Sequence, residues 1–374
     1  MKCVKYIYIL SVVLLSACSS HQTRVEHMLG DTVRFKYAKL LTVVRYDGYT
    51  EADVADPWNE DKILHKYVLV PKNKILPKKL PQGTILRTPL QRSVVFTAAH
   101  CQLLDWLGVV DDIKGVCDLK YVLNKNILQK YRTGKIADCG DGMAPVVEKI
   151  INIKADAMLL SPFENSGGYG KLEEIGIPIV ECADYMESTP LGRAEWMKFY
   201  GMIFGCEHIA DSLFHVVDSS YHVMKYRAIK LPLGRSILTE RKTGSTWYCP
   251  GGSSTMGQMI KDAHGCYAFA KDKHSGSLLL SPEEVLAKAG NTDVWAFKYD
   301  GGRPMDKVGL LAEYHGYPGL KCFRTGEIYE CDCRKVPYFD ETPFRPDFLL
   351  HDLILLLHPQ EMGAMRYYTK IEKK

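Results

Sequence analysis

Short, nearly continuous apolar runs alternate with segments of helical spacing after the first quarter of the chain. Three runs read SVVFTAA at 93–99, AMLLSP at 157–162 and IPIVECADY at 177–185. Helical spacing follows the first run at 100–113 and precedes the second at 145–152. Strands that alternate with helices favour parallel β-α units, whose strands are apolar because both sheet faces are covered. The pattern therefore predicts an α/β lobe.

A proline-free stretch between Arg193 and Ala228 follows this lobe. Its apolar residues keep helical spacing at Ile209, Leu213, Val216, Tyr221 and Met224. A glycine at position 205 interrupts the stretch. We therefore predict a shorter helix, a break at Gly205 and then a helix of about 20 residues or more that ends before Pro232.

The β-α rhythm resumes after this helix. STWYCPGG at 245–252 predicts a strand that leaves into a glycine turn, and STMGQMIKDAHG at 254–265 predicts a helix capped by its last glycine. SPEEVLAKAGNTDVWAF at 281–297 predicts a helix and then a buried strand, an echo of PVVEKIINIKADAMLL at 145–160. HDLILLLHP at 351–359 predicts a largely buried helix. These segments indicate a second α/β lobe.

The segment before the first lobe is different. Two β-branched runs at 41–46 and 67–70 flank a polar middle with an Asp-Pro-Trp-Asn turn signal. Residues 71–92 are rich in Pro, Lys and Gly and are interpreted as a connecting loop. The prediction is a small β-rich N-terminal extension that packs on the main body.

The chain opens MKCVKYIYILSVVLLSAC, with an early positive charge, an apolar core and small residues before Cys18. That order is typical of a secretory signal peptide, and the apolar run is too short for a transmembrane helix of about 20 residues. Leu15-Ser16-Ala17-Cys18 resembles the lipobox of bacterial lipoproteins, which implies cleavage before Cys18 and lipidation of its thiol. The alternative is an ordinary secreted protein with a chance cysteine near its cleavage site.

The predicted fold is thus α/β, with two lobes joined by one long α-helix and a small β-rich N-terminal extension. We expect a signal peptide at 1–17, a lipidated N-terminus with the extension at 18–92, the first lobe at 93–204, the linking helix at 205–231 and the second lobe at 232–374.

Composition supports a globular chain and excludes some partners. The sequence is 46% hydrophobic and 25% charged, which is typical of a folded protein. A net charge of +4 is too small to argue for nucleic acid. Ten of the 12 cysteines remain after Cys3 and Cys18 are set aside. An oxidising envelope permits disulfides, although their pairing cannot be read from the sequence.

Cys331-Asp332-Cys333, with Cys322 nearby, raises the question of structural zinc. Zinc patterns normally have two residues between paired cysteines and a second pair, so buried thiols or one local disulfide are favoured here. We expect no bound metal and no resident cofactor.

Several stretches, in this order and spacing, resemble the substrate-binding lipoproteins of ABC importers for iron-siderophore complexes and cobalamin. The resemblance covers roughly residues 92–374 and is closest to the Bacteroides-type versions. It is carried by PVVEKIINIKADAMLLSPFE, ECADYMESTPLGRAEWMKFYGMIFGCEHIAD, TGSTWYCPGG and FRPDFLLHDLILLLHP. The resemblance implies two Rossmann-like lobes bridged by a long helix, with ligand in the cleft between them.

The resemblance also implies a permease, with its ATPase, as partner. In the family, a surface glutamate on each lobe docks onto arginines of the permease. By motif these fall on Glu148 and Glu283, with Glu284 an open alternative to the second. Each glutamate can also be explained as a helix-start acid favoured by the helix dipole.

Ligands of open α/β sheets bind outside the carboxyl ends of strands, so the residues that follow each predicted strand are the candidates for ligand contact. Large planar ligands favour aromatic walls with a few polar points, and an anionic chelate favours a cation such as Arg193 or Lys298. His100 is equally explained as a helix-start residue, and Trp247 and Tyr248 as core. The candidates are His100, Phe163, Glu164, Tyr185, Arg193, Trp247, Tyr248 and Tyr299.

We expect a membrane-anchored, monomeric solute-binding protein of the cell envelope that delivers an iron-siderophore-type chelate to an ABC permease. A cobalamin or haem carrier of the same family and a non-transport scavenging lipoprotein are the alternatives. An enzyme is disfavoured because the sequence contains neither a Gly-x-Ser-x-Gly elbow nor a His-Glu-x-x-His motif.

Overall fold

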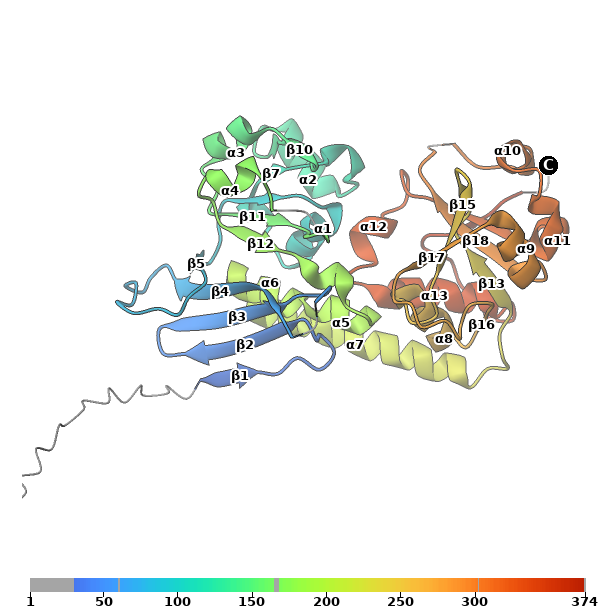
Figure 1. Cartoon of the computed structure of the whole chain (residues 1–374), viewed down its shortest axis with the longest axis horizontal. Coiled ribbons are helices and arrows are strands. Elements are labelled where there is room, and N and C mark those ends of the chain that lie inside the picture. Colours follow the sequence, from blue (N-terminus) through green and yellow to red (C-terminus); the bar gives the residue numbers. More distant parts are fainter. Residues whose placement is uncertain (1–29, 60, 165–167, 302, 373–374) are drawn as a thin grey trace, which may run out of the picture.

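The computed structural model describes residues 30–59, 61–164, 168–301 and 303–372. Two α/β lobes lie side by side, and the long helix α7 (Glu207–Ile229) runs beneath both (Figure 1). A separate β-sheet packs beside the first lobe at its N-terminal end. The predicted fold class is therefore confirmed. The signal peptide and Cys18 lie outside the described residues.

The N-terminal extension is a five-stranded sheet in the order β1-β2-β3-β4-β5. The first four strands pair antiparallel and β5 joins parallel to β4. The interpretation of 71–92 as a loop was wrong in part, because β5 forms within it, with Leu86 fully buried. The strands are β1 (Asp31–Val33), β2 (Leu41–Tyr46), β3 (Tyr49–Ala55), β4 (Ile63–Pro71) and β5 (Thr84–Thr88).

The first lobe is a parallel sheet in the order β12-β11-β6-β7-β8, with every residue of β11 buried. Its strands are β6 (Ser93–Val95), β7 (Ile113–Val116), β8 (Ala137–Asp138), β11 (Ala157–Leu160) and β12 (Ile179–Glu181). Its helices are α1 (Ala98–Trp106), α2 (Lys125–Arg132), α3 (Val147–Ile153) and α4 (Lys171–Glu174), and a small hairpin pairs β9 (Gly140–Asp141) with β10 (Ala144–Pro145).

A helical segment leads out of this lobe through α5 (Pro190–Glu195) and α6 (Met197–Phe204) into α7 (Glu207–Ile229). Gly205 ends α6 with a left-handed φ of 71°, a conformation that glycine adopts without steric penalty. The predicted break therefore lies where the sequence places it.

The second lobe has its main sheet in the order β16-β13-β18-β19-β20, parallel except for β20. The STWYCPGG strand, β15, lies instead in a small antiparallel sheet with β14 and β17. The strands are β13 (Ser236–Thr239), β14 (Lys242–Thr243), β15 (Thr246–Pro250), β16 (Cys266–Tyr267), β17 (Ser277–Leu280), β18 (Val294–Tyr299), β19 (Ile328–Asp332) and β20 (Thr369–Lys370). The helices are α8 (Thr255–Asp262), α9 (Pro282–Ala289), α10 (Lys307–Glu313), α11 (Lys321–Thr325), α12 (Tyr338–Glu341) and α13 (Pro346–Leu357).

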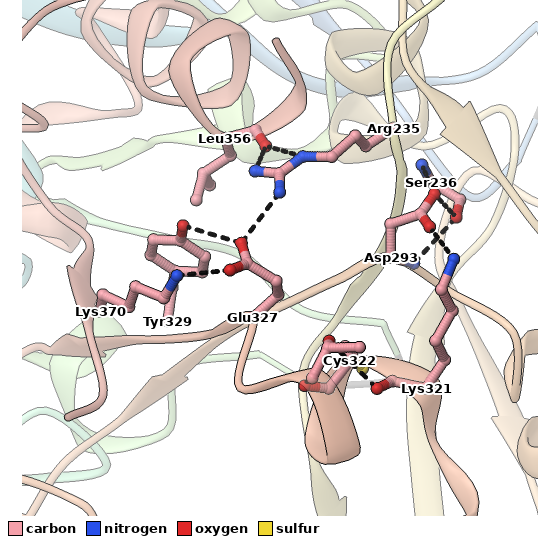
Figure 2. A network of polar contacts seen from close by, with 10 residues as sticks. Arg235, Ser236, Asp293, Lys321, Cys322, Glu327, Tyr329, Leu356 and Lys370 are labelled. Atoms are coloured by element: carbon pink, nitrogen blue, oxygen red, sulfur yellow. Dashed lines mark hydrogen bonds and ion pairs between the residues drawn. The ribbon is translucent and has the colours of Figure 1, made fainter. Parts of the chain in front are cut away.

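Polar contacts close the amino ends of the strands in the second lobe (Figure 2). Asp293, just before β18, accepts hydrogen bonds from the amide and hydroxyl of Ser236 at 2.9 and 2.7 Å. Glu327, just before β19, accepts from Arg235 at 2.9 Å and pairs with Lys370. These contacts fix the amino ends of the strands to one another, and they lie at the end of the sheet opposite to the carboxyl ends of the strands.

Two buried carboxylates attach the extension to the first lobe. Glu195 accepts hydrogen bonds from the successive backbone amides of residues 36, 37 and 38 at 2.6–3.0 Å. Glu187 accepts from the amides of residues 39 and 40, at 2.9 Å in each case, and from the Trp196 indole at 2.9 Å. The two side chains thus fix a five-residue strap, residues 36–40, against the lobe.

None of the helices in the described part of the chain is long and apolar enough to cross a membrane.

Replacing Glu195 with alanine should lower the free energy of unfolding by about 2–4 kcal/mol, because three backbone amides, one of them fully buried, lose their buried acceptor. Chemical denaturation measures the loss, and limited proteolysis should show faster cleavage near the strap. Glu174→Ala, at an exposed helical position of the same lobe, is the control. Equal stability of the two variants would show that the strap does not depend on Glu195.

Candidate functional site

A cavity of about 1040 Å³ lies between the two lobes. It is bounded by residues that follow β6, β7 and β11 in the first lobe and β18 and β19 in the second, the position expected for ligands of open α/β sheets. Helix α12 projects between the lobes beside it (Figure 1). Its polar and aromatic lining includes Thr97, His100, Asp118, Lys120, Tyr121, Ser161, Arg193, Lys298, Asp300, Arg334, Tyr338, Phe339 and Asp340.

A buried carboxylate organises the first-lobe wall. Asp184 is fully buried and accepts hydrogen bonds from His100 Nε2 at 2.9 Å and from the Tyr200 hydroxyl at 3.0 Å. The Arg193 Nε donates to its other oxygen at 3.1 Å. Thr97 caps α1 and contacts His100 Nδ1 at 2.5 Å. Arg193 thereby faces the cavity from a fixed position, and its Nη groups have no other partner among the described residues.

The surroundings of His100 favour its charged form. Burial alone lowers the pKa of the imidazole, but Cys182 and the Asp184 carboxylate raise it to about 10. Burial likewise acts to raise the pKa of Asp184, but His100 and Arg193 hold it below its ordinary value. The wall therefore presents two cations around one buried anion at neutral pH.

The second-lobe wall repeats the arrangement of a cation held by a carboxylate. Lys298, at the end of β18, pairs with Glu240, and its Nζ lies 5.3 Å from the centre of the Tyr338 ring. Burial opposes its charge, but Tyr338 and Glu240 raise the pKa of the ammonium above its usual value. Arg334, just after β19, pairs with Asp300 at the exposed rim. Cations from both lobes therefore line one space.

Aromatic and sulfur-containing side chains fill the remaining lining. Tyr121 from the first lobe and Phe339 from α12 are each 55% exposed, so their rings are available to a ligand. Met256, Met259 and Cys333 contribute sulfur atoms from the second lobe. The site combines exposed aromatic faces with fixed cations.

Two of the eight candidate ligand contacts, His100 and Arg193, line the cavity, and so does Lys298. Phe163, Glu164 and Tyr248 are exposed and do not line it. Tyr185 donates its hydroxyl to the Pro162 carbonyl at 2.5 Å, outside the lining.

Trp247 and Tyr299 lie in the core of the second lobe rather than in the cavity. Trp247 is fully buried, packs its ring 5.6 Å from Tyr317, and donates to the Glu240 carbonyl at 3.2 Å. Because side chains alternate along β15, Trp247 faces inward and Tyr248 outward. Tyr299 is buried and donates its hydroxyl to the Arg303 carbonyl. We therefore leave both out of the proposed site.

Sequence reasoning missed Tyr121, Phe339, Cys333 and Arg334. The last two directly follow IYECD, an apolar run that forms β19 and that the strand-end rule could have identified. Tyr121 follows the short strand β7, whose Lys and Gly hide the apolar pattern. Phe339 lies on α12, a helix of four residues with no periodic signal.

Both predicted docking glutamates occupy the second position of a helix and are exposed, Glu148 on α3 and Glu283 on α9. Glu284 is engaged differently. Its carboxylate accepts the Ser281 amide at 2.9 Å in a capping box. Because Glu284 is engaged in the helix cap, Glu283 is the better candidate of the two for contact with a partner.

All ten cysteines that the structure describes are free thiols. The Sγ atoms of Cys331 and Cys333 lie 3.9 Å apart. Cys322 lies at the other end of the lobe near Asp293, where its amide donates a hydrogen bond to the Thr292 carbonyl (Figure 2). Within the described ranges, no group of three or more His, Cys, Asp or Glu side chains is placed to hold a metal ion.

Comparison with known proteins identifies relatives of this architecture. A family model described as periplasmic binding protein matches residues 94–334. An uncharacterized lipoprotein of Methanocaldococcus jannaschii is 25% identical over 350 residues, which span 87% of this chain and 82% of the relative.

Two solved structures share the fold. One is an ABC-type Fe3+-hydroxamate transport system protein of Saccharomonospora viridis, with a TM-score of 0.57, 18% identity, and coverage of 72% of this chain and 93% of that one. The other is the IsdE protein of S. aureus complexed with heme, with a TM-score of 0.56, 17% identity, and coverage of 71% and 98%.

The ion pair between His100 and Asp184 predicts how the free energy of unfolding depends on pH. A histidine whose folded-state pKa is raised stabilises the fold fully below its unfolded pKa of about 6.5, and this contribution is lost as pH rises through about 10. Relative to His100→Gln, the wild type should lose about 1.4 kcal/mol of unfolding free energy per pH unit across that window. Denaturant titrations from pH 6 to 10 measure the slope, with His351→Gln, a more exposed histidine, as control. Parallel curves for wild type and His100→Gln would contradict a charged His100.

Proposed function

Because the chain belongs to the periplasmic binding protein family, we propose that it captures an anionic iron-siderophore-type chelate between its lobes and delivers it to an ABC permease. Binding requires a cleft that both lobes can close, and no catalytic group. The observation that carries the proposal is the cavity at the strand ends of both lobes, with fixed cations on each wall.

The chemistry of the lining supports a large anionic ligand. A volume of about 1040 Å³ lies at the upper end of ordinary small-molecule sites. Arg193 and Lys298 offer charge-assisted donors from opposite walls, which suits oxygen-rich chelates. The exposed rings of Tyr121 and Phe339 offer flat apolar faces for an extended π system.

Cobalamin and haem are the alternative ligands, because both also favour aromatic walls. The solved relatives named above are described as a hydroxamate transport protein and a heme complex, which keeps both ligand classes open for this chain. A scavenging lipoprotein that lacks a permease is the alternative role.

Anchoring and docking complete the proposal. Lipidation at Cys18 would hold the chain on an envelope membrane, in keeping with a relative named as a lipoprotein. Glu148 and Glu283 would meet arginines of the permease, one glutamate from each lobe. Exposed carboxylates of this kind give orientation and association rate more than bulk affinity.

Ligand class is tested by a thermal-shift and titration panel of ferric hydroxamate, ferric catecholate, cobalamin and haemin. A ferric siderophore should raise the melting temperature of the wild type, and Arg193→Gln should weaken its binding about tenfold or more. Arg132→Gln, on exposed helix α2, is the matched control. Binding of cobalamin or haemin alone would replace the siderophore assignment. No binding by any member of the panel would contradict the proposed ligand class.

Docking is tested by pairing two measurements on the same variants. Glu148→Arg with Glu283→Arg should leave ligand affinity unchanged and nearly abolish uptake by cells, since like charges then face the permease. Glu284→Gln should leave uptake intact, because Glu284 serves the helix cap. Wild-type uptake by the double variant would show that the glutamates do not dock, and lost affinity would show that they serve the fold or the cavity.

A further inference from the structure

A pair of cysteines lies in the second-lobe wall of the cavity. Cys331 lies on β19, and Cys333 directly follows that strand. Their Sγ atoms are 3.9 Å apart. Cys333 lines the cavity and is partly exposed, whereas Cys331 is fully buried. A molecule in the cavity can therefore reach one sulfur of the pair and not the other.

The surroundings of Cys333 favour its thiolate, which is the form that attacks disulfides. The contact with Cys331 is the largest influence and lowers the pKa of the Cys333 thiol. Burial acts against this, the Lys298 ammonium acts with it, and Glu240 and Asp332 act against it, with a net pKa below the ordinary value. The same contact raises the pKa of Cys331, so the proton of the pair stays on the buried sulfur.

We propose that this pair undergoes thiol–disulfide exchange with small disulfides that enter the cavity, with Cys333 as the attacking sulfur and Cys331 as the resolving one. In the first step Cys333 Sγ bonds to one sulfur of the small disulfide, and the other sulfur leaves with the electron pair as a thiolate. That thiolate takes the proton of Cys331, whose sulfur then attacks Cys333 Sγ and releases the second thiolate. The cysteine pair is oxidised to one disulfide bond, and the small disulfide is reduced to a thiol and a thiolate.

The cavity sets the size of the disulfide that can react. A space of about 1040 Å³ holds an organic molecule of ordinary drug size. The exposed rings of Tyr121 and Phe339 line the same space and offer flat faces to an aromatic disulfide. The expected partners are therefore small organic disulfides. The exchange concerns the cavity wall alone, so it does not rest on the chelate proposed as ligand.

Other cysteines of the chain supply matched controls. Cys117 and Cys139 in the first lobe also contact each other, but both are fully buried and neither lines the cavity. Cys206 is partly exposed, as Cys333 is, but burial raises its pKa to about 11, and none of the other described cysteines contributes to that pKa. The first-lobe pair therefore has a partner thiol without access, and Cys206 has access without a partner thiol.

Reaction of the full-length protein with dithiobis(nitrobenzoate), an aromatic disulfide that releases a coloured thiolate, tests the exchange. The protein is purified in detergent, reduced and freed of reductant beforehand. A fast phase should release two thiolates per chain, and mass spectrometry should then find Cys331 and Cys333 joined, without adduct and with the loss of two hydrogen atoms. Cys206 should react at least about tenfold more slowly, because its raised pKa leaves little thiolate. Cys117 and Cys139 should react only after unfolding.

Variants separate the roles of the two sulfurs. Cys333→Ser should abolish the fast phase, and Cys206→Ser should leave it unchanged. Cys331→Ser should release one thiolate and keep a stable mixed disulfide at Cys333, with its melting temperature compared with that of the wild type because Cys331 is buried. If that variant fails to fold, the wild-type product still decides the resolving role. A mixed disulfide that persists at Cys333 of the wild type would overturn the proposal, as would a Cys333 that reacts no faster than Cys206.

Discussion

Three buried carboxylates within a dozen residues hold this molecule together. Asp184, Glu187 and Glu195 follow strand β12 and are at most 3% exposed. A buried charge is stable only when its oxygens are hydrogen bonded, so each carboxylate imposes a position on the groups around it. Asp184 positions the cavity wall, and the other two fix the N-terminal strap. The short segment between the first lobe and α7 therefore connects the extension, the lobe core and the site.

A cation held by a carboxylate lies on each side of the cavity. Arg193 is held by Asp184 in the first lobe, and Lys298 by Glu240 in the second. A cation restrained by a carboxylate behind it has lost much of its side-chain freedom before a ligand arrives, so less entropy is lost on binding. It also keeps its direction towards the cavity. The site is thus preorganised in charge, while the exposed rings at the rim remain adaptable.

Sequence patterns predicted the architecture but only part of the candidate site. Buried parallel strands and a proline-free helix leave strong periodic signals, so the two lobes and α7 could be predicted. The strand-end rule selected His100 and Lys298, and the charge of an anionic ligand suggested Arg193; all three line the cavity. The rule could not tell which face of β15 points inward, and hence that Trp247 is core. Short elements such as α12 give no periodicity.

The anchoring roles of Glu187 and Glu195 were invisible for another reason. Their partners lie about 150 residues earlier in the chain, where the groups bonded are backbone amides that carry no sequence signature.

The extension is best understood as part of the first lobe. β12 is the edge strand of its sheet, and an uncovered edge invites pairing with other chains. Tyr67 of β4 reaches this edge and accepts the Glu181 amide at 2.8 Å, while the His65 ring stacks on Tyr67 at 4.4 Å. Glu181 is itself buried enough that its pKa rises to about 7, so the junction has little tolerance for added charge. With the strap bonded to Glu187 and Glu195, the extension covers the edge and completes the core of the lobe. Because the extension supplies hydrogen-bonding partners for buried groups of the first lobe and shares its hydrophobic core, loss of either part removes packing and hydrogen bonds from the other.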